Sequence, residues 1–150
     1  MNTKLLAMFM LALAAACSSG PIAKVALDDE VRRLCAIDGG IKVYETVTLP
    51  AGRFNQFGAI QIPDKANAKP NDDYYYEWNV TYLLRGNPEL WRSEHQIIRA
   101  HDGKIIGKSV RYSRRGGDAS GPWHESSFSC PEIGSQSNLE KSIFGIGENK

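Results

Sequence analysis

Residues 74–84, which read YYYEWNVTYLL, decide the fold of this chain because an apolar side chain stands at every second position of the segment. Aromatic and aliphatic residues occupy every second position: Tyr74, Tyr76, Trp78, Val80, Tyr82 and Leu84. Successive side chains of a strand point to opposite faces, so this period of two predicts a strand with one face in the core. The alternative is an exposed row of rings that stacks on sugars of the cell wall.

The segments that follow predict a β-hairpin. Residues 90–100 and 104–114 flank Asp102 and Gly103, a dipeptide typical of a two-residue hairpin turn. The hairpin adds two strands to the aromatic one, so the centre of the fold is predicted to be an antiparallel sheet.

A loop made only of these two residues sets the register of the hairpin. It places Glu94 opposite Arg111, where opposite charges favour the pairing, and Trp91 opposite Arg114, as a cation–π pair. One face of the hairpin then carries Trp91, Ser93, His95, Ile97, Lys108, Val110, Tyr112 and Arg114.

Three further elements complete the predicted fold. Residues 23–37 are predicted to form a helix, 41–49 a strand rich in β-branched residues, and 124–130 a final strand. The apolar stripe of the helix consists of Leu27, Val31, Leu34 and Cys35. The expected fold is α+β, with one N-terminal helix packed on a four- or five-stranded antiparallel sheet.

The length of 150 residues suits one domain, which we place at residues 23–131. The remaining residues, 132–150, are polar and contain several glycines, so they are predicted to form a mobile tail with a short helix at 138–144.

The N-terminus carries a basic residue, Lys4, followed by 12 apolar residues, Leu5 to Ala16. Such a run is too short to span a membrane permanently and suits a cleaved signal peptide, residues 1–16. The sequence LAAAC that ends at Cys17 resembles the lipobox of bacterial lipoproteins. The resemblance implies a diacylated Cys17, a tether at residues 17–22 and, with Ser18 next, the periplasmic face of the outer membrane. Plain secretion is the alternative, since Ala-x-Ala also suits general signal peptidase.

The number of cysteines agrees with export. If Cys17 carries lipid, Cys35 and Cys130 remain as a pair in an oxidising compartment, where a disulfide is the expected outcome. Two buried free thiols are the alternative, and the spacing of the cysteines is a poor match to a metal site.

Several short segments of the body also resemble a group of small, uncharacterised exported proteins of proteobacteria. They are residues 34–40 (LCAIDGG), 86–93 (GNPELWRS), 112–118 (YSRRGGD), 121–124 (GPWH) and 127–130 (SFSC). This resemblance implies no catalytic residue and no ligand.

The charge of the chain offers one local feature. The whole sequence has 18 basic and 17 acidic side chains, a balance that gives no reason to expect nucleic acid as a partner. Residues 85–115, however, carry a local excess of basic side chains. We expect Arg114, Arg115, Trp123 and His124 to line a contact loop for anionic lipid, lipopolysaccharide or another cell-wall component.

Catalytic chemistry is weakly indicated. A hydrolase acting on the cell wall could use His124 with Asp118 or Glu125, and Ser126 or Ser127 as nucleophile, but the chain has no GxSxG motif. No HExxH motif and no pair of histidines at metal-ligand spacing is present, so neither a metal nor another cofactor is expected. The expected function is a membrane-anchored envelope lipoprotein with a structural or binding role. The alternatives are the hydrolase and an inhibitor or exclusion factor that binds another exported protein.

Overall fold

The structure is a computed structural model that describes residues 21–119, 121, 124–130 and 136–147. The predicted signal peptide, Cys17 and Trp123 therefore lie outside the described residues. No helix in the described ranges combines the length and the apolar character that crossing a membrane requires.

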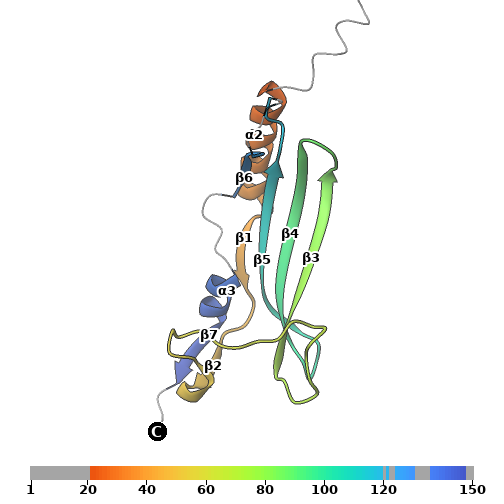
Figure 1. Cartoon of the computed structure of the whole chain (residues 1–150). Coiled ribbons are helices and arrows are strands. Elements are labelled where there is room, and N and C mark those ends of the chain that lie inside the picture. The colour runs from red at the N-terminus through yellow and green to blue at the C-terminus, as the bar shows by residue number, and fades with distance from the viewer. Residues whose placement is uncertain (1–20, 120, 122–123, 131–135, 148–150) are drawn as a thin grey trace, which may run out of the picture.

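A five-stranded antiparallel sheet forms the body of the protein, as predicted (Figure 1). Its strands are β1 (Gly40–Val43), β3 (Tyr74–Leu84), β4 (Glu89–Arg99), β5 (Ile105–Arg115) and β6 (Ser127–Ser129). The order across the sheet is β1-β5-β4-β3, and β6 pairs with the C-terminal end of β5. The aromatic strand β3 is consequently an edge strand.

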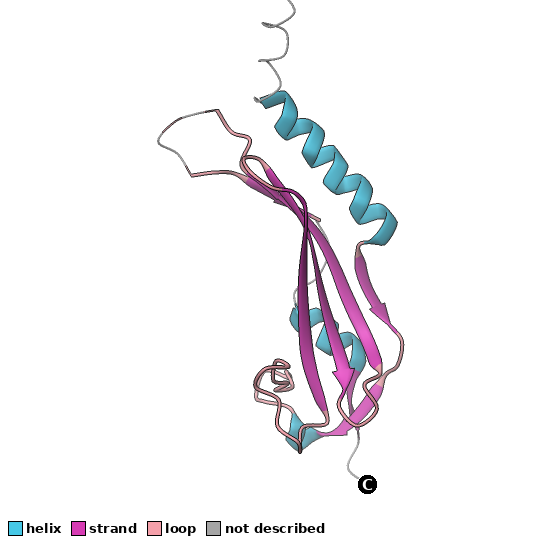
Figure 2. Cartoon of the chain, turned by 90° about the vertical axis from the view of Figure 1, so that its right-hand side faces the viewer, coloured by secondary structure: helices cyan, strands magenta, loops and turns pink. Residues whose placement is uncertain are grey.

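The predicted N-terminal helix is present as α2 (Pro21–Asp38) and lies along β5 and β6 on one face of the sheet (Figures 1 and 2). Its predicted apolar stripe packs as expected: Val31 is fully buried, and Leu27, Leu34 and Cys35 surround it. On the sheet, this cluster contains Leu90, Val110 and Tyr112.

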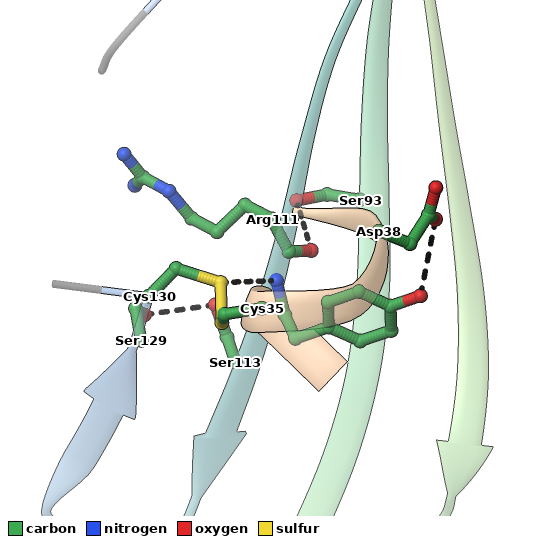
Figure 3. Close-up of a disulfide and its surroundings, with 8 residues drawn as sticks. Cys35, Asp38, Ser93, Arg111, Ser113, Ser129 and Cys130 are labelled. Carbon is green, nitrogen blue, oxygen red and sulfur yellow. Dashed lines mark hydrogen bonds between the residues drawn. A yellow bond between two sulfur atoms is a disulfide. The ribbon is translucent and has the colours of Figure 1, made fainter. Parts of the chain in front are cut away.

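The predicted disulfide joins Cys35 on α2 to Cys130, which directly follows β6 (Figure 3). The Sγ atom of Cys130 also accepts a hydrogen bond from the backbone N–H of Tyr112 at 3.2 Å. The bridge thus ties the helix to β5 and β6, the strands that it covers.

The prediction of a single strand over residues 41–49 is wrong. The chain forms β1 and then β2 (Val47–Pro50), which belongs to a separate two-stranded sheet. The change of direction is held by the backbone N–H groups of Tyr44 and Glu45, which both donate to the carbonyl oxygen of Ile106. A pattern of β-branched residues cannot reveal such a shared acceptor.

The short helix predicted within the tail is confirmed, but residues 136–147 pack as part of the fold instead of forming a separate tail. They form α3 (Gln136–Ile143) and β7 (Phe144–Gly147), and β7 pairs in parallel with β2. Leu139, Ile143 and Phe144 are buried in a second core with Tyr76 and Ile97. Residues 136–147 therefore contribute to the core, and the domain does not end at residue 131.

The two helices cover opposite faces of the sheet. Gly107 lies opposite Ile97, and a Cβ atom built on Gly107 would come within 2.5 Å of the Ile143 side chain of α3. Val110 and Tyr112, which contact α2, point to the other face of β5 because they are an odd number of residues away.

The predicted hairpin register is wrong by one residue. Glu94 lies opposite Val110 rather than Arg111, and Trp91 lies opposite Ser113 rather than Arg114. The loop has four residues, because the backbone N–H of Arg99 donates to the carbonyl oxygen of Lys104 at 2.9 Å.

A bulge then shifts the strands again, since Ile98 pairs with Ile105 while Ile97 pairs with Gly107. An extra residue on one strand moves every following side chain by one position. As a result Arg111, and not Arg114, shares a face with Trp91 and His95.

The prediction that the aromatic face of β3 lies in the core holds only for its first part. Tyr76 is buried, but Trp78, Val80 and Tyr82 are exposed. The eight residues of α3 span about 12 Å, whereas the 11 residues of β3 span about 37 Å, so one short helix cannot cover the face.

Removing the disulfide should lower stability strongly, because it closes a loop with a sequence separation of 95 residues. We expect the double variant Cys35→Ser/Cys130→Ser to lose about 2–5 kcal/mol of unfolding free energy in urea denaturation. Reductant should destabilise the parent protein by a similar amount and leave the double variant unchanged. A loss within the error of the measurement would show that packing alone holds α2 on the sheet.

Candidate binding surface on strands β3 and β4

Five side chains form an uncovered surface on the face opposite α2, which we call the open face. They are Trp78, Val80 and Tyr82 from β3 and Trp91 and His95 from β4. Trp78 pairs with His95 across the strands, Val80 with Ser93, and Tyr82 with Trp91. These positions share one side of the pleat, so the rings lie on one surface.

The rings of the open face contact one another in pairs. The Trp78 and His95 rings are stacked with centroids 5.8 Å apart, and the Tyr82 and Trp91 rings are tilted with centroids 6.3 Å apart. Trp78 is nevertheless 64% exposed and Tyr82 40% exposed. Cross-strand contacts therefore orient the rings without removing them from solvent.

Basic groups lie beside this surface. The guanidinium carbon of Arg85 lies 4.2 Å from the centre of the Tyr82 ring, a cation–π contact. Burial lowers the pKa of His95 below its ordinary value, and the positive charge of Arg111 lowers it further. Both effects favour the neutral form of the His95 imidazole.

The outer edge of β3 is open along the same stretch. The backbone N–H of Tyr76 donates to the Pro63 carbonyl oxygen, and the Tyr76 carbonyl oxygen accepts from the N–H of Lys65, both at 2.8 Å. Both backbone groups of Tyr76 thus point away from β4. By the two-residue repeat of a strand, those of Trp78, Val80 and Tyr82 point the same way.

The predicted contact loop is not a binding surface as a whole. Arg114 is 1% exposed: its guanidinium pairs with Asp28 at 2.8 Å and also donates to the carbonyl oxygens of Gly116 and Ser126. The prediction that Arg114 contacts a ligand is wrong, because its hydrogen bonds join α2 to the loop after β5. The register error contributes to this mistake, since it placed Arg114 on the face of Trp91 and His95, whereas Arg114 lies on the face that α2 covers.

The other members of that loop have different environments. Arg115 and His124 are exposed, and Trp123 lies outside the described residues. Arg115 pairs with Glu89 at 2.9 Å and lies 3.6 Å from Glu125.

The local excess of basic residues is largely balanced by carboxylates from other parts of the chain. Asp38 pairs with Arg92, Glu45 with Arg99 and Lys104, and Asp28 with Arg114. A count of charges over residues 85–115 misses these partners because they are distant in sequence.

The residues of the hydrolase hypothesis form a structural contact. Asp118 accepts hydrogen bonds from both the backbone N–H and the hydroxyl of Ser126, and pairs with Lys24 at 2.6 Å. The Lys24 ammonium, together with Ser126, holds the pKa of Asp118 well below its usual range, so this carboxylate is a poor proton acceptor. No hydrogen bond between described residues joins His124 to either of them.

Within residues 21–119, 121, 124–130 and 136–147, no group of three or more His, Cys, Asp or Glu side chains is placed to hold a metal ion. A comparison with protein-family models, curated proteins and solved structures finds no match for this chain. The open face is thus the strongest candidate site in the described part of the protein, and it was visible in the sequence only as the alternative reading of the aromatic row.

Replacing Arg114 and Arg115 one at a time should show that the buried Arg114 stabilises the fold and that the exposed Arg115 contributes little. Arg114→Ala leaves the carboxylate of Asp28, 16% exposed, without its partner, and we expect a loss of about 3–5 kcal/mol of unfolding free energy. Arg115→Ala removes a guanidinium that is 58% exposed from its pair with Glu89, and should cost about 0–1 kcal/mol. Urea denaturation measures both, and equal losses would contradict the assignment.

The His95 imidazole should titrate below the ordinary histidine pKa of about 6.5 in an NMR pH titration. Because its pKa is lower in the folded state, its contribution to stability is complete above about pH 6.5 and falls as the pH drops through the folded-state pKa. The variant Arg111→Gln should raise the His95 pKa without restoring it fully, since burial remains. A His95 pKa at or above 6.5 in the parent protein would contradict the described environment.

Proposed function

We propose that this protein is a lipid-anchored binding protein of the cell envelope, and that its open face binds the glycan strands of the cell wall without catalysis. The observation that carries the proposal is the exposure of Trp78 and Tyr82 on one side of a sheet edge. Large aromatic side chains left in water over a continuous surface are typical of an interaction site.

The chemistry of the open face suits a sugar. The face of an aromatic ring is electron-rich and apolar, and it attracts the slightly positive C–H groups that one side of a pyranose ring presents. Trp78 and Tyr82 are four residues apart on β3, about 14 Å along the strand, so they can contact different units of one extended chain. Arg85, over the Tyr82 ring, supplies N–H donors for carboxylate or carbonyl groups of such a ligand.

The N-terminal sequence and the disulfide support the proposed location in the cell envelope. Residues 1–17 read as a lipoprotein signal with its cysteine, and a bridge between Cys35 and Cys130 is expected of a protein in an oxidising compartment. The first turn of α2 lies at the end of the molecule where β3 ends (Figure 1).

The proposal is tested by co-sedimentation of the full chain with cell walls isolated from a Gram-negative bacterium. We expect Trp78→Ala and Tyr82→Ala each to weaken binding about tenfold, because each removes a stacking surface worth about 1–1.5 kcal/mol. Tyr44→Ala is the matched control, since Tyr44 is also exposed, at 55%, but follows β1 at the other edge of the sheet.

Two outcomes would contradict the proposal. Equal sedimentation of the parent protein and the two open-face variants would exclude glycan as the ligand of this surface and favour a protein partner. Release of soluble fragments from the walls by the parent protein, and not by His124→Ala, would show a hydrolase instead.

A further inference from the structure

We propose that the outer edge of β3 pairs with the β3 edge of a second copy, in antiparallel orientation and with Val80 opposite Val80 of that copy. The inference goes beyond glycan binding and rests on the backbone of the edge rather than on the rings. It explains why an uncharged stretch of this edge is left open in the described part of the chain.

The edge lacks the usual protection against pairing. Edge strands are normally short, charged, interrupted or covered. The opposite edge follows this rule, since β1 has four residues and includes Lys42. By contrast, β3 has 11 residues, and its segment 78–84 carries no charge and no proline.

The open part of the edge has two defined ends. At Tyr76 the edge is occupied by residues 63–65, which form a parallel bridge and two backbone hydrogen bonds. At Leu83 a bulge interrupts the register, since Tyr82 pairs with Trp91 and Leu84 with Leu90. Within the described ranges, the outward N–H and C=O groups of Trp78, Val80 and Tyr82 have no backbone hydrogen-bond partner.

One antiparallel register satisfies all of these groups at once. With Val80 opposite its own copy, Trp78 lies opposite Tyr82 of the second copy, and each opposed pair exchanges two hydrogen bonds. A shift toward the N-terminus places Tyr82 opposite Tyr76, whose backbone groups are already bound. A shift toward the C-terminus places Trp78 opposite Leu84, beyond the bulge.

The side chains match this register. Trp78 beside Tyr82 of the second copy is an aromatic pair, and Val80 beside Val80 is a β-branched pair; both kinds stabilise antiparallel sheets. The segment between Glu77 and Arg85 carries no charge, so no like charges oppose one another within the paired part; Glu77 is paired with Lys65 of its own chain at 3.0 Å. The two-fold axis is perpendicular to the sheet, and the two open faces therefore join into one surface.

Cysteine cross-linking of the full chain tests the register. Opposed residues of an exchanging pair have Cα atoms about 5.5 Å apart, within the range of a disulfide. Val80→Cys should therefore cross-link to itself under mild oxidation and give a dimer on a non-reducing gel. Asn79→Cys or Thr81→Cys alone should cross-link far less, since like positions are then about 7–8 Å apart, but a mixture of the two should cross-link efficiently.

The second measurement is the mass of the detergent-solubilised chain by sedimentation. We expect the parent protein to be a dimer and Val80→Lys to be a monomer with an unchanged circular dichroism spectrum, because Val80 is 38% exposed and its substitution leaves both cores intact. Val43→Lys, on the β1 edge and 39% exposed, is the matched control and should remain a dimer.

Three outcomes would each overturn the proposal. The parent protein could be a monomer, Val80→Lys could remain a dimer, or another single cysteine variant could cross-link to itself more strongly than Val80→Cys. No cell wall is present in either experiment. Their outcome is therefore independent of whether the open face binds glycan.

Discussion

The attachment of α2 to one side of the sheet is the constraint on which the rest of the structure depends. The Cys35–Cys130 bridge (Figure 3) and the cluster around Val31 hold the helix over β5 and β6. A helix fixed on this side cannot cover Trp78, Val80 and Tyr82, whose side chains point to the other face. On that other face the eight-residue α3 reaches only the first half of β3, so the second half stays exposed and forms the candidate site.

Ion pairs reinforce the same placement at the middle and at the end of α2. In its middle, Asp28 pairs with the buried guanidinium of Arg114. At its last residue, Asp38 accepts two hydrogen bonds from Arg92, at 3.1 and 3.0 Å, and one from the Tyr112 hydroxyl. Burial opposes ionisation of Asp38, but Arg92 and Lys42 together hold its pKa below the usual range. A carboxylate at the negative end of a helix is unfavourable, and these cations offset that cost.

The open face and the β3 edge follow from one arrangement of the strand. The side chains of Trp78, Val80 and Tyr82 point to the uncovered face, while their backbone groups point away from β4. Ligand binding by the rings and strand pairing by the backbone therefore use different atoms of the same three residues. Pairing would extend the sheet through both copies and place two aromatic surfaces side by side.

The sequence by itself determined the local elements. The period of two over residues 74–84 predicted the aromatic strand, and the apolar stripe from Leu27 to Cys35 predicted the helix; together they gave the α+β class. The number of cysteines predicted the disulfide. These features depend on neighbouring residues or on counting, which the sequence shows directly. The alternative interpretation of the aromatic row, as a surface that stacks on sugars, also pointed to Trp78 and Tyr82 of the open face.

Only the tertiary structure decided which faces are covered. The four-residue loop and the bulge near Ile106 moved the hairpin by one residue, which exchanged the faces of Arg111 and Arg114. The packing of Leu139, Ile143 and Phe144 ordered a segment whose composition indicated a tail. The extent of α3 then left Trp78 and Tyr82 in solvent. Alternation along a strand specifies two faces, but which of them is buried depends on distant elements that pack against it.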